Sequence, residues 1–368
     1  MLPGKPTRNQ EVVLSTLLLT LTMLITALIG EMTIRFIHWY RDGIPMFVDE
    51  GRTRVSRSPI TLDEALGWRA AENYRFDGFR QSSDETKYPV HVTQNELGFR
   101  MFGHVRSITP KILVIGDSFT HAVNVSDDKT YYAYIRDSLH VDVFAYGGSG
   151  YGTLQEYFIL DKYLDLIKPD LILWQYCQND FINNSAELEI ESKWNNNGLV
   201  RPYWVNGHIV YVLPKKYNER IRKFAIEYSR LLHFIISRVD RLSAHLPVES
   251  IETHIESEGA GHPGFSRSIL VTEDLMSKVK ARAGQVPVFA FSVGDGHAFY
   301  TDAFRQISSH HGIFFFGDVE VAIRAAEDKG VVVREKDGAH WNETGHQIVG
   351  EVLTSYLKRS VLELAQKH

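Results

Sequence analysis

The stretch Ile112-Leu113-Val114-Ile115-Gly116-Asp117-Ser118-Phe119 decides the fold of this chain. Four consecutive apolar residues are typical of a strand that is buried on both faces of a parallel sheet. Asp117 and Ser118 follow directly, at the carboxyl end of that strand, where open α/β sheets place their ligands and chemistry. Glycine, aspartate and serine are also ordinary turn residues, so the tripeptide alone is a weak signal. Its position nevertheless makes Ser118 a candidate nucleophile.

The alternation that begins at this strand continues to the C-terminus. Further apolar runs predict buried strands at residues 141–145, 171–176, 286–293 and 313–316, and segments with helical spacing separate them. One of these segments opens on the capping box Thr153-Leu154-Gln155-Glu156. Strands that alternate with helices imply a three-layer α/β/α domain around a parallel, five-stranded sheet.

A second polar motif, Asp337-Gly338-Ala339-His340, precedes the last predicted helix. A serine hydroxyl is a poor nucleophile at neutral pH and needs a base to take its proton. His340 is the candidate base, and Asp337, three residues earlier, can hold the tautomer of its imidazole and balance the imidazolium. His121 lies three residues after Ser118 and is the alternative base. Asp117 and Asp180 are expected to fix their loops through backbone hydrogen bonds.

Four short blocks, in this order and spacing, resemble those of the SGNH/GDSL hydrolase superfamily. They are Gly116-Asp117-Ser118, the glycine-rich segment 147–153, Cys177-Gln178-Asn179-Asp180 and Asp337-Gly338-Ala339-His340. The resemblance covers roughly residues 110 to 360. The chain departs from the family pattern at Tyr146, where an asparagine is usual, and at Cys177, where a glycine is usual.

The resemblance implies a flavodoxin-like strand order and a role for each matched residue. Ser118 would be the nucleophile, His340 the base and Asp337 its partner. The oxyanion hole would consist of the Ser118 N–H, the Gly150 N–H and the side-chain amide of Asn179, with Gly152 as the alternative to Gly150. Preorganised donors of this kind are worth roughly 3–4 kcal/mol each in the transition state.

Composition excludes several other classes of protein. The net charge of −5 over 368 residues, without a dense block of Lys and Arg, argues against a nucleic-acid partner. The single cysteine, Cys177, excludes an internal disulfide framework, and no spacing suggests a metal site. The segment 147–152 lacks both the Walker and the Rossmann patterns of a phosphate cradle. We therefore expect neither a cofactor nor a metal.

The N-terminus predicts a membrane anchor. Residues 12–30 carry no charge and, as a helix, would span about 28 Å, roughly one hydrocarbon core. The segment is long for a signal peptide, and no small-x-small cleavage site is evident near its end. Lys5 and Arg8 favour a cytoplasmic N-terminus, but arginines also cluster after the segment, so charge alone leaves the topology open. Anchored relatives in the superfamily usually face outward, which favours a periplasmic or extracellular catalytic domain on a single-pass protein.

These signals divide the chain into a cytoplasmic N-terminus (1–11), an anchor (12–30), a membrane-proximal region (31–109) and a hydrolase domain (110–362) with an insertion at 183–284. Within the insertion, Asn206-Gly207 predicts a hairpin. A basic amphipathic helix is expected at 217–244 and a loop at 247–265. Because such insertions overhang the site, this one is the expected source of substrate selectivity.

The resulting hypothesis is a membrane-anchored serine esterase that forms an acyl-Ser118 intermediate. Its substrate would be an ester-containing small molecule, lipid or glycan. Two alternatives remain at this point. One is an O-acyltransferase that acts on a cell-surface glycan, because transfer uses the same residues with a different acceptor. The other is a catalytically inactive binding or assembly protein with the same fold, which the departures at Tyr146 and Cys177 would fit.

Overall fold

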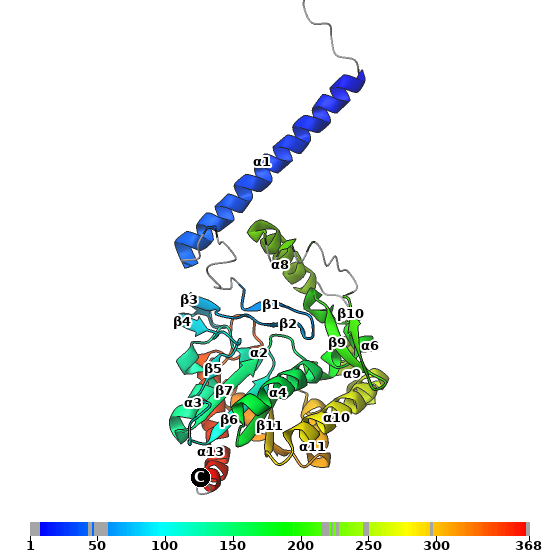
Figure 1. Cartoon of the computed structure of the whole chain (residues 1–368). Helices are drawn as coiled ribbons and strands as arrows, with labels where there is room; N and C mark the ends of the chain where they lie inside the picture. The colour runs from blue at the N-terminus through cyan, green and yellow to red at the C-terminus, as the bar shows by residue number, and fades with distance from the viewer. Residues whose placement is uncertain are drawn as a thin grey trace, which may run out of the picture. The chain divides into compact units, whose positions relative to one another are not determined.

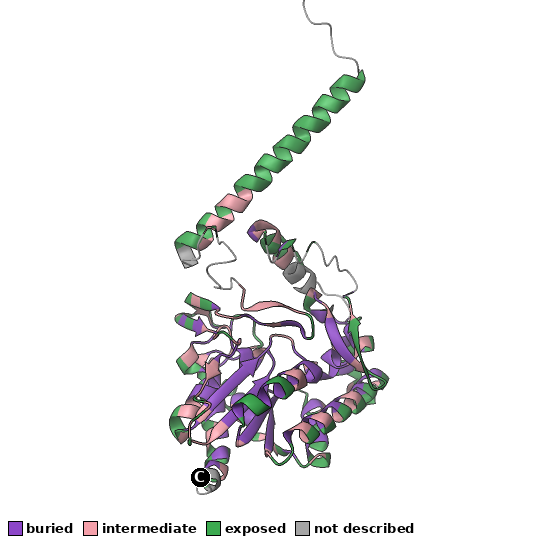
Figure 2. Cartoon of the chain, viewed as in Figure 1, coloured by how far each residue is buried: buried purple, intermediate pink, exposed green. Residues whose placement is uncertain are grey.

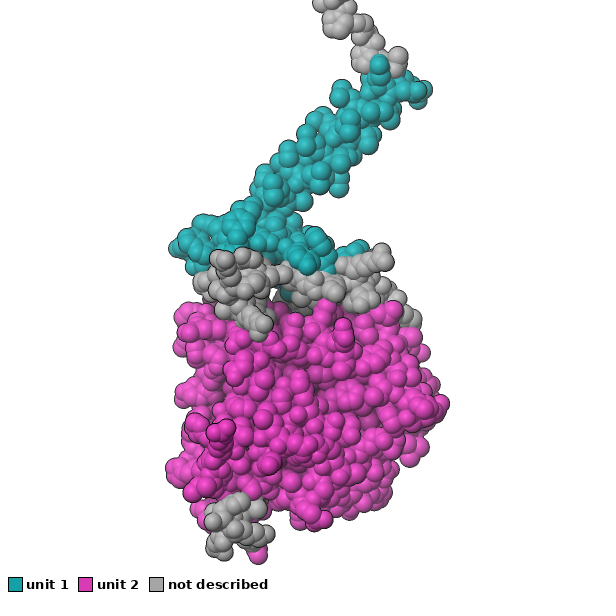
Figure 3. Space-filling view, in the orientation of Figure 1, with its two compact units in different colours: residues 1–53, 218–246 teal, residues 54–217, 247–368 magenta. Residues whose placement is uncertain are grey.

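The computed structural model describes residues 8–42, 46–47, 58–193, 195–214, 221, 224–225, 228–245, 250–294 and 297–365. The chain forms two compact units (Figure 3). The smaller contains residues 1–53 and 218–246, and the larger contains residues 54–217 and 247–368. The larger unit therefore contains every residue that the sequence predicts to belong to the catalytic triad or the oxyanion hole.

A six-stranded sheet forms the centre of the larger unit (Figure 1), in the order β12-β11-β8-β6-β7-β5. Its strands are β5 (Met101–Phe102), β6 (Lys111–Gly116), β7 (Asp142–Gly147), β8 (Leu171–Tyr176), β11 (Val288–Ser292) and β12 (Phe314–Phe316). The five strands from β6 onward pair in parallel and follow the flavodoxin-like order, as expected. The antiparallel edge strand β5, which pairs with β7, was not predicted because two residues carry no periodicity.

Helices cover both faces of this sheet. The helices described in the larger unit are α2 (Ser118–His121), α3 (Tyr131–Leu139), α4 (Thr153–Ile167), α5 (Asn179–Asn183), α6 (Ala186–Glu189), α9 (Ile251–Glu258), α10 (Pro263–Ala283), α11 (Ala298–His310), α12 (Asp318–Glu327) and α13 (Glu343–Ala365). The 3₁₀ turns are η1 (Asp127–Lys129), η2 (Asn195–Gly198) and η3 (Gly259–Gly261). Helix α3 packs on α13, which packs on α12, and α4 packs on α10, which packs on α11. Right-handed crossovers place the α3 and α4 groups on opposite faces, since β7 and β8 flank β6.

The central strands of the six-stranded sheet are buried (Figure 2). Every residue of β8 and β11 is buried, and so is every residue of β6 and β7 after the first. Residues from these strands and from α3 and α13 form one continuous apolar cluster. A rigid sheet edge is thus available to hold the loops that follow each strand.

Three hairpins accompany the sheet within the larger unit. Strands β1 (Ile60–Asp63) and β2 (Gly67–Ala70) pair in antiparallel fashion, as do β3 (Arg75–Gln81) and β4 (Lys87–Thr93). Strands β9 (Arg201–Val205) and β10 (His208–Val212) form the hairpin predicted at Asn206-Gly207, where both turn residues have positive φ.

Two predictions within the insertion were wrong. The loop expected at 247–265 holds α9, η3 and the start of α10, although residues 247–249 lie outside the described residues. Ser250 precedes α9, and His262 accepts from the Phe265 N–H at 3.2 Å ahead of Pro263 at the first position of α10. The single helix expected at 217–244 is interrupted at Tyr228 and Ser229, and α8 begins only at Arg230 (Arg230–His245). Residues 217–220, 222–223 and 226–227 of that prediction lie outside the described residues.

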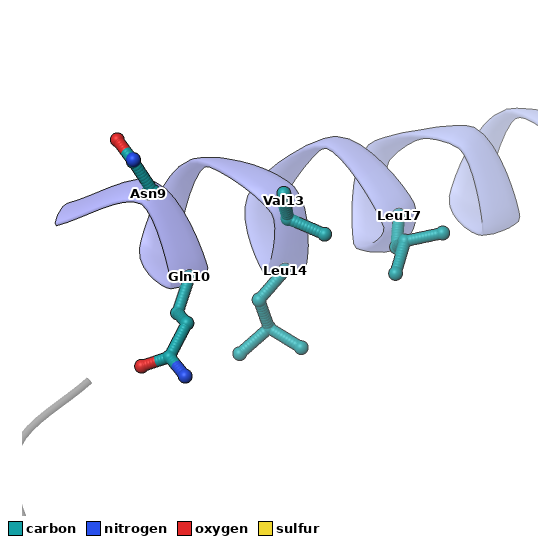
Figure 4. A pocket seen from close by; sticks show the side chains of 5 residues that line it. All are labelled: Asn9, Gln10, Val13, Leu14 and Leu17. Carbon is teal, nitrogen blue, oxygen red and sulfur yellow. The ribbon is translucent and has the colours of Figure 1, made fainter. Parts of the chain in front are cut away.

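The smaller unit contains α1 (Arg8–Asp42) and α8, which contact each other. Helix α1 is long and apolar enough to cross a membrane from Arg8 to Tyr40, and its leucines are exposed, Leu18 by 65% (Figure 2). A shallow hollow along its first turns is lined by Asn9, Gln10, Val13, Leu14 and Leu17 (Figure 4). None of these five side chains is titratable or nucleophilic, so the hollow carries no chemistry of its own.

Candidate active site

Ser118 occupies a sharp turn between strand and helix. It follows β6 and is the first residue of α2, and Asp117 before it accepts from the Phe119 N–H at 3.0 Å as the helix cap. The Asp117 N–H donates to the Gln175 side-chain carbonyl at 3.1 Å, which ties the turn to β8. Asp117 therefore fixes the loop, as expected, and leaves the half-buried Ser118 side chain at the carboxyl edge of the sheet.

The structure brings the three residues of the predicted triad together. Ser118 Oγ lies 2.8 Å from His340 Nε2, and His340 Nδ1 lies 2.6 Å from Asp337 Oδ2. Both distances are within hydrogen-bond range, and they run through the two different ring nitrogens. A base in contact with the nucleophile and held by a third group is the arrangement that activates a serine.

The turn before α13 holds the histidine in place. Asp337 Oδ1 accepts from the N–H groups of Ala339 and His340, at 2.9 and 3.0 Å. Gly338 has φ +74°, which favours glycine at this position. Burial opposes the charged carboxylate, but the hydrogen bonds from His340 and the two amides together lower the pKa of Asp337 below its ordinary value. Asp337 is therefore a carboxylate that can balance a positive charge on His340.

The three predicted oxyanion donors follow three adjacent strands, β6, β7 and β8. Gly150 lies in the loop after β7, which is held beside the nucleophile because the Gly148 N–H donates to Gly116 O at 3.1 Å. Asn179 is the first residue of α5 and follows β8 after Cys177 and Gln178. In the described part of the chain, the Ser118 N–H, the Gly150 N–H and the Asn179 side-chain amide donate to no protein acceptor. They are thus available to a ligand oxygen.

Gly152, the alternative to Gly150, has a different environment. Its N–H donates to Gln155 Oε1 at 3.3 Å, and it caps α4 as the residue before Thr153. The next residue is bonded to the C-cap of α5, since the Thr153 N–H donates to Asn184 Oδ1 at 2.8 Å. These contacts favour Gly150 over Gly152 as the oxyanion donor.

The other histidines near the site have structural partners. His121 is fully buried, with Nδ1 2.8 Å from Ser149 Oγ and Nε2 2.6 Å from the Gln94 amide nitrogen. Burial, and then the charge of Arg100, lower its pKa to about 3. His346 accepts from the Tyr131 N–H at 3.2 Å within the core. These contacts leave His340 as the histidine that touches Ser118.

Three buried carboxyl groups lie behind the nucleophile. Burial raises the pKa values of Asp117, Glu156 and Asp180, and repulsion among the three raises those of Glu156 and Asp180 well above the ordinary range. Asp180 accepts from the Cys177 N–H at 2.9 Å and so fixes its loop, as predicted. The raised pKa values favour the neutral form of these carboxyl groups, which reduces their repulsion of the negative charge that an oxyanion would bring to this edge.

Two contacts at the oxyanion loop were not predicted. Ser149 O accepts from Trp68 Nε1 at 2.9 Å and from Asn197 Nδ2 at 3.3 Å. No short motif surrounds either donor, and each lies far from Ser149 in the sequence. Among the described residues, no group of three or more His, Cys, Asp or Glu side chains is arranged to hold a metal ion.

The sheet has the flavodoxin-like strand order, Gly-Asp-Ser follows its first parallel strand, and Asp-x-x-His precedes the last helix. Together these features define a hydrolase of the SGNH/GDSL class. The sequence profile described as GDSL-like Lipase/Acylhydrolase matches residues 112–353. The chain belongs to this family, and the resemblance found in the sequence is confirmed.

Similar solved structures include three esterases or lipases. They are the psychrotrophic esterase EstA from Pseudoalteromonas sp. (10% identity, 68% of this chain and 97% of that one, TM-score 0.38), the lipase/acylhydrolase from Enterococcus faecalis (12%, 68% and 96%, 0.39) and the acetylxylan esterase Axe2 from Geobacillus stearothermophilus (13%, 68% and 94%, 0.34). No curated protein gives a significant sequence match.

Proposed function

We propose that this protein is a membrane-anchored serine esterase that hydrolyses an ester-linked acyl group. The observation that carries the proposal is the unbroken chain of contacts from Ser118 Oγ through His340 to Asp337, at 2.8 and 2.6 Å. Membership of the GDSL-like lipase/acylhydrolase family supports the same chemistry.

In the proposed mechanism, Ser118 Oγ attacks the ester carbonyl carbon while His340 Nε2 takes the hydroxyl proton. The carbonyl oxygen becomes an oxyanion, which receives hydrogen bonds from the Ser118 and Gly150 N–H groups and the Asn179 amide. The tetrahedral intermediate collapses, the C–O bond to the alcohol breaks, and His340 returns the proton to the leaving alkoxide.

The second half repeats these steps with water. His340 removes a proton from water, whose oxygen attacks the acyl-serine carbonyl carbon. The bond to Ser118 Oγ then breaks, Oγ regains the proton from His340, and the acid is released. Throughout the cycle, Asp337 stays ionised and stabilises the imidazolium, as its lowered pKa favours.

The proposed anchor is the apolar part of α1, and the proposed domains are those that the sequence suggests: 1–11, 12–30, 31–109 and 110–362. The exposed leucines of α1 support the anchor, because soluble proteins rarely expose so large an apolar surface. Lys5 and Arg8 lie before the span and arginines also cluster after it, so the proposed extracytoplasmic position of the catalytic domain rests on the outward orientation that is usual for anchored relatives in the superfamily. An ester in a lipid or a surface glycan is the substrate class that fits such a position.

Acyl transfer would use the same residues, so the decisive test is the fate of the acyl-enzyme. With p-nitrophenyl acetate, an esterase should turn over steadily with water alone, at a rate insensitive to added oligosaccharide. A transferase holds its acceptor and keeps water out. A burst followed by near arrest, relieved by a glycan that becomes acylated, would contradict the esterase proposal and favour the transferase.

A further inference from the structure

The loop that presents Gly150 forms a tight turn. The Tyr151 N–H donates to Gly148 O at 2.9 Å, so Ser149 and Gly150 are the two central residues. Gly150 has φ +70°, the value that the third residue of a type II turn requires. Type I and type II turns differ mainly by a flip of the central peptide, here the Ser149–Gly150 peptide. The direction of this one peptide decides where the Gly150 N–H points.

The carbonyl of this peptide is held by two donors. Trp68 Nε1 donates to Ser149 O at 2.9 Å, and Asn197 Nδ2 donates to it at 3.3 Å. Because the peptide is trans and planar, its C=O and N–H point in opposite directions. Any group that fixes the Ser149 carbonyl therefore also fixes the Gly150 N–H, which donates to no protein acceptor in the described ranges.

Trp68 is itself immobilised. Its side chain is fully buried, and its own carbonyl accepts from Tyr151 Oη at 2.9 Å, so β2 and the turn are joined by two reciprocal bonds. The Arg201 guanidinium lies over the indole, 4.8 Å from the ring centroid, and donates to Gln155 of α4 at 3.0 Å. The indole N–H thus comes from a rigid platform that precedes the family-matched segment 112–353.

We propose that Trp68 is a positioning residue that sets the oxyanion hole by orienting the Ser149–Gly150 peptide. The hairpin β1–β2, contributed by the region before the hydrolase segment, would then complete the hole. The superfamily usually has an asparagine just before this loop, but this chain has Tyr146. The Tyr146 ring packs on Phe99, with the ring centroids 5.0 Å apart, and we propose that Trp68 supplies the anchoring of the loop. The inference rests on the proposed function, because it presumes that Gly150 donates to an oxyanion.

The test compares Trp68→Phe with wild-type full-length protein in detergent. Removal of an oxyanion donor costs about 10²–10³ in kcat, and a donor that is only misdirected should cost about 10–100-fold. We expect kcat for p-nitrophenyl acetate to fall by this factor with KM nearly unchanged. A boronic acid, which mimics the tetrahedral intermediate, should bind more weakly by a similar factor.

Trp204→Phe is the matched control, because it also removes an indole N–H bond, here to Asp274 on α10. It should keep wild-type kcat. If Trp68→Phe does not fold, β-(3-benzothienyl)alanine at position 68 keeps the shape of the ring and lacks only the N–H donor, and the same fall in kcat is expected.

Wild-type kcat without the indole donor would overturn the inference, and so would a rise in KM alone, which indicates a role in substrate binding. Absence of Ser118 labelling by a fluorophosphonate in wild-type protein would instead overturn the proposed function. The two failures are therefore distinguishable.

Discussion

Ser118 and His340 are 222 positions apart in the sequence, yet Oγ and Nε2 lie 2.8 Å from each other. Their proximity was predictable because each belongs to a recognisable motif at an element boundary, and parallel strands gather such boundaries at one edge. The contacts of Trp68 and Asn197 were not predictable in this way. An indole or amide N–H can donate to any carbonyl, and only the folded chain selects Ser149.

Glu335 is a buried carboxyl group just before the triad turn. Only 2% of the residue is exposed, and its N–H donates to His340 O at 2.8 Å. Burial raises its pKa to about 7, with the charge of Asp337 adding to the rise, although Tyr88 donates a hydrogen bond to it. At pH 5 the folded protein therefore holds a proton that the unfolded chain has largely released.

This raised pKa predicts a pH-dependent stability. As the pH rises from about 4.5 to about 7, the unfolded chain ionises Glu335 first, so the free energy of unfolding falls. Glu335→Gln removes this loss and keeps an oxygen for the Tyr88 hydroxyl. The difference in melting temperature, variant minus wild type, should therefore be more positive at pH 8 than at pH 5, by about 2 °C or more. A difference that is independent of pH would contradict the raised pKa.

The helix boundaries in the insertion differ from those that the sequence predicts. Ser250 before α9 and Pro263 at the start of α10 are both good initiation signals. The loop prediction was wrong because Gly259-Ala260-Gly261 forms only a short 3₁₀ turn between two helices. The parallel strands were easier to predict, because four or more buried apolar residues in a row leave few alternatives.

Within the smaller unit, Glu31 of α1 caps the start of α8. Its two carboxylate oxygens accept from the N–H groups of Arg230 and Leu231 at 3.1 and 2.9 Å, and from Ser229 Oγ at 2.9 Å. A side-chain cap is worth about 0.5–2 kcal/mol to a helix. The distant partner explains why the sequence alone did not place this helix start.

Glu31→Ala should therefore loosen the first turn of α8. We expect amide hydrogen exchange of residues 230–232 to become roughly 5- to 30-fold faster, since this corresponds to about 1–2 kcal/mol of lost protection. Glu11→Ala, which removes a carboxylate from the first turn of the same helix α1, is the control and should leave exchange in α8 unchanged. Equal exchange in wild type and Glu31→Ala would rule out the capping role.

The full chain combines a hydrolase fold with one long apolar helix. If residues 12–30 are an uncleaved anchor, the expressed protein should keep its N-terminus and stay with the membrane pellet after alkaline carbonate extraction. A signal sequence would behave differently. Recovery of a soluble protein whose N-terminus lies beyond residue 30 would show cleavage and would contradict the anchor proposal.

The most direct test of the central claim is covalent labelling of purified full-length protein with a fluorophosphonate probe. We predict that one probe attaches to Ser118, that Ser118→Ala abolishes the signal, and that His340→Ala slows labelling by several orders of magnitude because no base takes the hydroxyl proton. A folded, monodisperse wild-type protein that stays unlabelled, or one that is labelled at another residue, would contradict the assignment of Ser118 as the nucleophile.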